Sequence, residues 1–189
     1  MGRVARLQIA GGLYHVTSRG NARGAIYKDD ADYSTFLRHL AKVIKRFDWR
    51  CHTFCLMPNH DHLMIETLEP NLAAGMHVLN LSYARFFNWR YRRVGHVFQG
   101  PYGAVPILTE GHLLTVVRYV VLNPVEAGLA ADPADWRWTS HRAIAGLEPP
   151  PEFLEVDRIR SYFRHAGSDG TREYLNFVTA PLRTLDLAA

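Results

Sequence analysis

The chain has 189 residues, 48% of them hydrophobic, and carries a formal net charge of +4 with a sequence pI near 9.2. This length is typical of one well-buried domain with a modest extension and is short for two full domains. No stretch approaches the ~18 apolar residues that cross a bilayer, and the N-terminus lacks a secretory leader, so we expect no membrane association. The basic balance suits a surface that follows a phosphate backbone.

The first half of the chain alternates strand and helix patterns. Asp29 or Asp30 can cap a helix that runs to about Phe47, because apolar residues recur there at helical spacing. Pro58 and Asn59 suit the centre of a tight turn between two antiparallel strands. In chain order we predict a strand (13–19), a glycine-containing loop (21–24), a helix (30–47) and two strands (49–57 and 60–67).

The second half begins with a long helix whose end is strongly basic. Thr109 is a suitable N-cap for a later helix, and we expect Pro124 to end that helix because the residue before a proline avoids the α region. The predicted elements are a helix (72–92), a loop leading into a short strand (97–107), a helix (110–122) and a weakly helical tail that opens with three prolines (149–151).

The order strand, helix, strand, strand, helix, strand predicts an α+β fold, the ferredoxin-like split βαβ with an antiparallel sheet. We expect a main domain over 1–146 and a C-terminal extension over 147–189 that is partly helical. Many functions share this architecture, so it does not define the function.

Two cysteines, Cys51 and Cys55, lie in a predicted strand. Four residues of strand separate them by about 13 Å, beyond the roughly 7 Å limit for a disulfide. We therefore expect reduced thiols and a cytoplasmic location. The same spacing excludes a structural zinc site that combines both cysteines with His60 and His62, and the lack of a Pro-Cys-x-x-Cys segment argues against a zinc deaminase.

Two pairs of side chains are candidates for chemistry. His60 and His62 are two apart in a strand, so both imidazoles project from one face and could bind a cation, although such a pair can also be incidental. Tyr119 and Asn123 are four apart in a helix and share a face. Taken alone, Tyr119 is better explained as a core aromatic with an exposed tip, and Asn123 as the residue that ends the helix before Pro124.

The combination of motifs resembles the single-tyrosine HUH transposases, and most closely the REP-associated tyrosine transposases of bacterial genomes. The matching segments cover most of residues 11–146 in the family's order: GGLYHVTSRGNARGAIY (11–27), MPNHDHLMIE (57–66), VFQG (97–100), RYVVLNPVEAGL (118–129) and DWRWTSHRAIAG (135–146).

This resemblance implies a metal-dependent nuclease that cuts and rejoins single-stranded DNA beside a hairpin in the DNA, and that acts in the nucleoid as a monomer or a homodimer. It implies that Tyr119 is the nucleophile that forms a 5′-phosphotyrosine, and that His60, His62 and Asn123 hold Mg²⁺ or Mn²⁺; no organic cofactor is expected. Residues implied to lie near DNA are Tyr14, His15, Arg19, Asn21, Arg23, Arg90 and Arg93. His15 could instead be an ordinary polar core residue.

Two departures from the family pattern affect these expectations. Asp61 is charged where an apolar or aromatic residue is common, but it should face away from the metal and affect packing. Pro101 and Gly103 stand where relatives carry basic residues, which weakens an expected DNA contact there. The alternative function is a regulator that binds DNA hairpins on the same scaffold without cleaving them.

Overall fold

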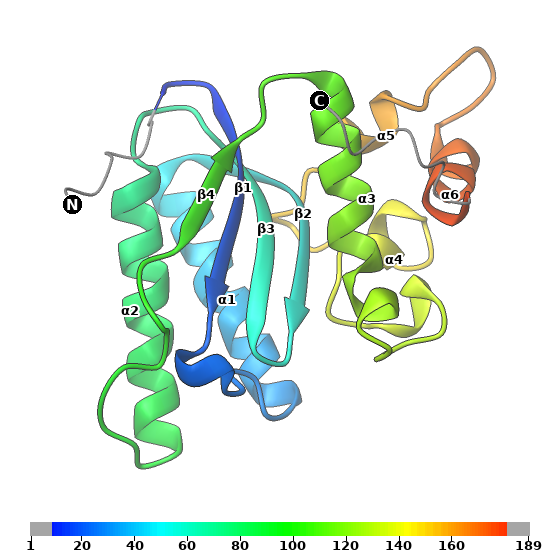
Figure 1. Ribbon diagram of the computed structural model, residues 1–189. Helices are drawn as coiled ribbons and strands as arrows, with labels where there is room; N and C mark the ends of the chain where they lie inside the picture. The colour runs from blue at the N-terminus through cyan, green and yellow to red at the C-terminus, as the bar shows by residue number, and fades with distance from the viewer. Residues whose placement is uncertain (1–8, 181–189) are drawn as a thin grey trace.

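A four-stranded antiparallel sheet with the order β2-β3-β1-β4 forms the middle of the computed structural model, which describes residues 9–180 (Figure 1). The strands are β1 (Gly12–Arg19), β2 (Trp49–Met57), β3 (His60–Thr67) and β4 (Gly103–Pro106). Their order along the chain and across the sheet is that of the split βαβ, so the predicted ferredoxin-like fold is confirmed.

Three long helices accompany the sheet, and shorter ones follow. The long helices are α1 (Asp30–Phe47), α2 (Leu72–Arg90) and α3 (Glu110–Glu126). The short helices are α4 (His141–Ile144), α5 (Val156–Ser161), α6 (Thr171–Thr179) and the 3₁₀ turns η1 (Asn21–Arg23) and η2 (Pro133–Asp135).

Two of the long helices, α1 and α3, begin where the sequence provides a cap. The side chain of Asp29 accepts hydrogen bonds from the backbone N–H groups of Ala31 and Asp32, and Thr109 accepts one from His112. These bonds satisfy amides that have no partner within the first helical turn. The predicted starts of α1 and α3 are therefore confirmed.

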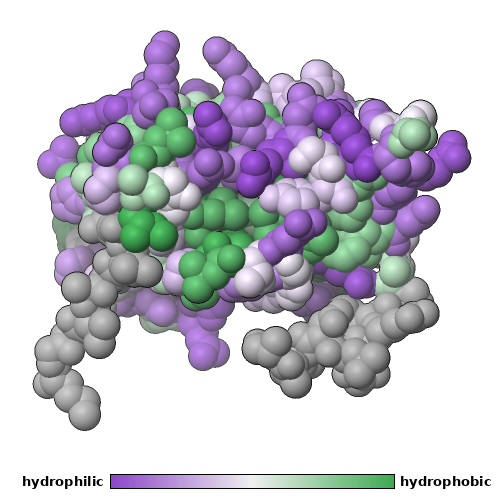
Figure 2. Space-filling model, turned by 90° about the horizontal axis from the view of Figure 1, so that it is seen from above, coloured by the Kyte–Doolittle hydropathy of each residue, from purple (hydrophilic) through white to green (hydrophobic). Residues whose placement is uncertain are grey.

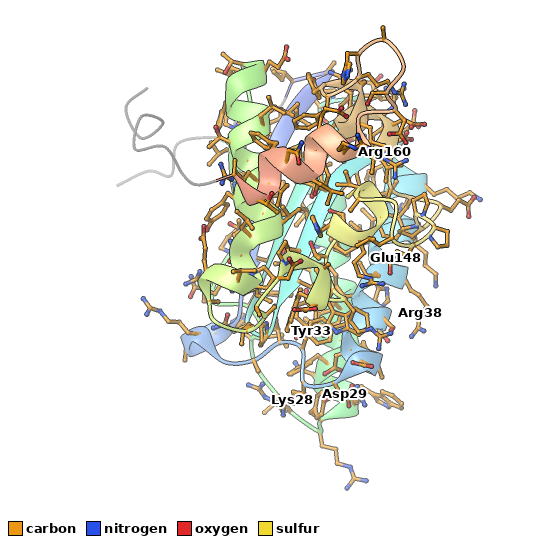
Figure 3. The ribbon with its side chains drawn as sticks, turned by 90° about the vertical axis from the view of Figure 1, so that its right-hand side faces the viewer. Lys28, Asp29, Tyr33, Arg38, Glu148 and Arg160 are labelled. Carbon is orange, nitrogen blue, oxygen red and sulfur yellow. The ribbon has the colours of Figure 1, made fainter. Side chains whose placement is uncertain are left out.

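The sheet has two different faces because the helices are divided between them. Helices α1 and α2 pack together on one face, whereas α3 packs against β2 and β3 on the other (Figures 1 and 3). Along β1 the side chains of Tyr14, Val16 and Ser18 are buried, and those between them are only half-buried or exposed. The part of the second face that β1 and β4 form is left open beside α3, and the candidate site lies there.

The prediction that Pro124 ends the helix is wrong, because α3 continues to Glu126 with the proline inside it. Proline disfavours a helix interior because it has no N–H to bond the carbonyl four residues earlier and because its ring clashes with that carbonyl. Only one short segment follows Pro124, and the buried Val120, Asn123 and Pro124 fix it against the core. The helix then ends through bonds from Ala127 N–H to Asn123 O and from Leu129 N–H to Pro124 O.

The chain after residue 146 packs onto the same core. Glu155 N–H donates to Cys51 O on the edge of β2, and the hydroxyl of the buried Tyr174 lies 3.0 Å from Nδ1 of His141. Arg160 donates to the carbonyl oxygens of Ala143 and Ile144 at the end of α4. The boundary between 146 and 147 stays a prediction.

Both cysteines are buried free thiols, as expected from their spacing. Within residues 9–180 no helix has the length and apolar character that a bilayer crossing requires.

Candidate active site

The two histidines of β3 project from the open face of the sheet, opposite β1. In the antiparallel register, His60 lies across from Arg19 and His62 across from Thr17. The residue between them, Asp61, points to the other face and is fully buried there. The strand therefore places both imidazoles on one face, with ring centroids 4.9 Å apart.

The ring of His62 is held from one side only. Its Nδ1 atom lies 2.9 Å from Nε2 of His15, and the two rings stack with centroids 5.2 Å apart. Its other nitrogen, Nε2, is buried and has no hydrogen-bond partner among the described residues. A buried polar atom without a partner is costly, so it indicates a site that a ligand can complete.

The ring of His60 is arranged in the same way. Its Nδ1 atom lies 2.7 Å from Oδ1 of Asn59, and because an amide oxygen can only accept, this nitrogen carries the proton. The Asn59 amide is itself fixed, since its Nδ2 donates to Arg23 O at 3.0 Å. The Nε2 lone pair of His60 is left free for a cation, with the Asn123 side chain within hydrogen-bonding range of the ring.

Asn59 is a site residue that the sequence analysis treated only as part of a turn. The signal was present in the segment PNHDH (58–62), where an amide immediately precedes the first histidine. An imidazole that binds a metal ion commonly donates its other N–H to an acceptor, which fixes the orientation of the ring.

Helix α3 brings Tyr119 and Asn123 to the same place. The Tyr119 ring meets the rings of His62 and His15 edge-on, with centroids 5.3 Å and 5.9 Å apart. The Tyr119 side chain is 43% exposed, which leaves its hydroxyl end accessible, whereas Asn123 is buried one helical turn further on. A phenol, two imidazoles and an amide therefore gather at one point of the open face.

The surroundings keep the imidazoles neutral at pH 7. Burial, together with the neighbouring His15, His60 and Arg19, lowers the pKa of His62 to about 3. Burial also lowers the pKa of His15 to about 4, with a smaller contribution from His112, and lowers that of His60. Neutral imidazole is the form that binds a metal ion.

These residues fit a divalent cation, because the neutral imidazoles of His60 and His62 lie side by side and the Asn123 side chain lies within hydrogen-bonding range of His60. Residues 9–180 contain no cluster of three or more His, Cys, Asp or Glu side chains suited to a metal. The protein part of such a site would therefore be neutral and incomplete, which leaves positions for anionic phosphate oxygens and water.

A cleft of about 550 Å³ extends from this point across β1 and β4. Gln99 and Gly100 line it, and Gln99 N–H donates to Arg19 O, so the segment before β4 closes one side. Gly103 faces Thr17, and a Cβ atom there would come within 2.8 Å of the threonine hydroxyl. The lining is His15, Thr17, Ser18, Arg19, His60, His62, Gln99, Gly100, Pro101, Gly103, Ala104, Val105 and Tyr119.

The residues expected near DNA divide into three groups. Arg19 and His15 line the cleft, although His15 is hydrogen-bonded to His62 rather than free. Asn21 and Arg23 are exposed on the turn that follows β1, where Arg23 has a left-handed backbone (φ 57°). Arg93 is exposed beyond the end of α2, with its guanidinium 5.6 Å from the centre of the Phe87 ring.

Two further residues that were expected near DNA have partners within the fold. Tyr14 is 1% exposed on the helix-covered face, and its hydroxyl accepts a hydrogen bond from Ile9 N–H, so it is a core residue. Arg90 forms a two-pronged ion pair with Asp29 and a further bond to the buried Asp32, so its charge is neutralised. Both side chains look suitable in the sequence, but tertiary contacts have already engaged them.

Asp61 has the packing role that was expected of it. It accepts hydrogen bonds from Ser18 N–H and from the Tyr27 hydroxyl under α1 and α2. Burial raises the pKa of Asp61 to about 8. Its carboxyl group faces away from the imidazoles and takes no direct part in the site.

Comparison with known proteins adds a family and a fold. The sequence model of the family described as "Transposase IS200 like" matches residues 9–123. A solved structure of a REP-associated tyrosine transposase bound to a REP hairpin superposes with a TM-score of 0.65 at 20% identity, covering 82% of this chain and 94% of the other. A Deinococcus radiodurans R1 protein, provisionally described as a transposase, gives a TM-score of 0.44 at 15% identity over 64% and 94% of the two chains. No curated protein matches the chain.

Proposed function

The chain belongs to the IS200-like transposase family, and from this we propose that it cuts and rejoins single-stranded DNA through a covalent bond to Tyr119. The observation that carries the proposal is the meeting of Tyr119 with His60 and His62 at the edge of an open cleft. The Oη–P bond forms as the bond between phosphorus and the DNA 3′-oxygen breaks. Tyr119 loses its phenolic proton, the 3′-oxygen gains one, and the DNA 5′-phosphate stays on the protein as a phosphotyrosine.

We assign His60, His62 and Asn123 as the residues that hold a divalent metal. When bound, the ion polarises the scissile phosphate and stabilises its developing charge. The imidazoles favour Mn²⁺ over the harder Mg²⁺, so manganese should support cleavage at least as well in vitro. Because the protein ligands are neutral, the positive charge of the ion would be balanced by the DNA phosphate.

We assign His15 the role of fixing the orientation and tautomer of His62. For His62 to present an Nε2 lone pair, its proton must sit on Nδ1, which then donates to Nε2 of His15 at 2.9 Å. His15 in turn carries its own proton on Nδ1. Asn59 does the same for His60, so each ligand has its own acceptor.

The substrate we propose is a strand that carries a hairpin next to the cut. The support is the fold shared with a transposase whose structure holds a REP hairpin, together with the exposed Arg19 and Arg23 beside the cleft. Because Tyr119 and His62 of the same chain are in contact, we propose that one chain forms a complete site without exchange of helices.

The proposal is tested by incubating wild type and Tyr119→Phe with end-labelled single-stranded hairpin DNA and Mn²⁺, followed by a denaturing gel. We expect an adduct that resists denaturation with wild type and none with Tyr119→Phe. Hairpin binding by wild type without any adduct, across a diverse set of hairpins, would instead indicate a regulator that does not cleave.

A further inference from the structure

The outer surface of the helix layer carries a groove that the catalytic cleft does not include. It has a volume of about 590 Å³ and lies between the first half of α1 and the end of α2. Arg38 projects from α1 away from the sheet (Figure 3). The groove, here called the Trp89 groove, is lined by Ala31, Thr35, Arg38, Phe86, Trp89, Arg90 and Arg92.

Trp89 is the unusual residue of this groove, because its side chain is 79% exposed. The other three tryptophans are engaged in the fold: Trp49 and Trp138 are buried, and the indole N–H of Trp136 donates to Leu56 O. An indole left in water contributes little to folding and offers a flat surface for stacking. Exposed aromatics beside arginines are the usual platform for unpaired bases.

The charges around the groove favour a polyanion. Residues 70–109 contain no Asp or Glu, and neither do residues 33–47 of α1, which include Arg38, Lys42, Lys45 and Arg46. At the start of α1, Asp29 and Asp32 are bonded to Arg90, and Asp30 is paired with Arg137. Among the described residues no carboxylate pairs with Arg38 or Arg92. Arg38 donates one hydrogen bond to the Thr35 hydroxyl, which is neutral, so the charge of both guanidinium groups is available to phosphate.

One segment of the chain joins the groove to the catalytic cleft. Arg92 lines the groove and Gln99 lines the cleft, so seven residues, at most about 25 Å, separate the two. The segment is tied to the end of β1 by bonds from Asn21 N–H to Val97 O and from Gln99 N–H to Arg19 O. Its charged residues are Arg92 and Arg93, so a bound strand meets no acidic side chain along it.

The opposite end of the molecule is different in character. Figure 2 looks onto the end of the molecule where α3 begins, and apolar side chains gather there with polar ones around them. Leu108, just before α3, is 74% exposed. The combination of an exposed indole with unpaired arginines belongs to the end that holds Arg19 and Arg92, where a DNA strand can reach it from the cleft.

We propose that the Trp89 groove is a second binding site for single-stranded DNA, where an unpaired base stacks on Trp89 and flanking phosphates contact Arg38 and Arg92. The inference rests on the proposed function, since the strand is a continuation of the one that enters the cleft. It involves none of the residues assigned to cleavage. The groove holds DNA away from the cut and so lengthens the stretch of strand that the protein contacts.

The test compares DNA of two lengths on the full chain carrying Tyr119→Phe, which prevents cleavage. An oligonucleotide of about 6 nucleotides fills the cleft alone, whereas one of about 20 reaches both sites. We expect Trp89→Ala to weaken binding of the long strand about 5- to 100-fold and to leave the short strand unaffected. Arg38→Ala with Arg92→Ala should lower the slope of log K against log salt by about 1.4 for the long strand.

A matched control removes two charges from the C-terminal end of α1, the helix that carries Arg38. Lys45→Ala with Arg46→Ala should not weaken the long strand more than the short one. Stacking is seen directly as quenching of indole fluorescence by the long strand, which Trp89→Phe should largely remove. Thermal unfolding of Trp89→Ala should match that of the parent, because the side chain is exposed.

For the long strand, an unchanged affinity of Trp89→Ala together with an unchanged salt slope of the Arg38→Ala, Arg92→Ala double variant would overturn the groove proposal. If wild type still forms the covalent adduct in that case, only the groove proposal is wrong and the proposed cleavage at Tyr119 stands. If Trp89→Ala loses affinity for the long strand but wild type forms no adduct, the groove stands and cleavage at Tyr119 fails.

Discussion

The two faces of the sheet are built from alternating residues of the same strands, yet one face forms the core and the other lines the candidate site. On the helix-covered face, Tyr14 and Asp61 are buried and fully engaged by neighbouring backbone and hydroxyl groups. One residue further along each strand, His15 and His62 lie on the open face against Tyr119. A shift of one position therefore separates a residue that stabilises the fold from one that lines the open cleft.

The difference shows that residue type is a poor guide to role in this sheet. Polar groups on the covered face find their partners within the protein, so their removal should cost stability. On the open face, the buried Nε2 of His62 has no partner in the described residues, so its removal should cost ligand binding. Substitutions on the two faces should thus change different measurements.

The largest effect on the open face should follow from His62→Gln. Glutamine keeps most of the volume but is a poor ligand, so we expect Mn²⁺-dependent cleavage to fall about 1,000-fold, as the loss of several kcal/mol of metal-assisted stabilisation implies. Cleavage rates under single-turnover conditions measure this. The control is His52→Gln, a buried histidine of β2 that bonds to Glu66 away from the cleft, which should retain its rate. Equal losses in both variants would show that only folding is affected.

His15→Leu should have an intermediate effect on the same face. Without an acceptor for the Nδ1 proton of His62, we expect Mn²⁺ affinity to fall about 10- to 100-fold. Titration of free Mn²⁺ by electron paramagnetic resonance measures it without DNA. His15→Gln restores an acceptor oxygen and should recover part of the affinity. Failure of both variants to change the affinity would exclude the assigned role of His15.

On the covered side, Arg90→Ala should lower the free energy of unfolding by about 2 kcal/mol. The substitution leaves the fully buried Asp32 without its cationic partner, although Tyr91 and Lys28 N–H still donate to it. Urea unfolding measures the change. Cleavage at a temperature where both proteins are folded should be unchanged, and a selective loss of DNA binding at full stability would restore Arg90 as a phosphate contact.

Tyr14→Phe should have the smallest effect. It removes the hydroxyl that accepts from Ile9 N–H and should lower the free energy of unfolding by about 1 kcal/mol. Fluorescence anisotropy with labelled single-stranded DNA should give an unaltered Kd. Weaker DNA binding without any loss of stability would mean that Tyr14 contacts the substrate after all.

Most of the fold could be predicted because its signals are local. Caps at Asp29 and Thr109, the turn at Pro58 and the period of two in the strands all act within a few residues. The course of α3 beyond Pro124 could not be predicted, because the packing that holds its last turn comes from distant parts of the chain.

The candidate site was harder to predict because it depends on which face stays open. The spacing of His60 and His62 fixed their common face but did not reveal that His15 and Asn59 hold their rings. Arg90 was expected on DNA, and its partner Asp29 lies 61 residues away, so no local pattern could show the ion pair. The resemblance to a family identified the candidate catalytic and metal-binding residues. The tertiary contacts then showed which of the expected residues lie at the open cleft and which have partners within the fold.

The measurement that tests the central claim most directly is to locate the protein–DNA bond. Wild type is incubated with single-stranded hairpin DNA and Mn²⁺, the adduct is isolated under denaturing conditions and digested, and its peptides are analysed by mass spectrometry. We predict a nucleotide 5′-phosphate attached to the peptide that contains Tyr119. Attachment to any other residue, or complete absence of an adduct from protein that binds the same DNA, would contradict the account.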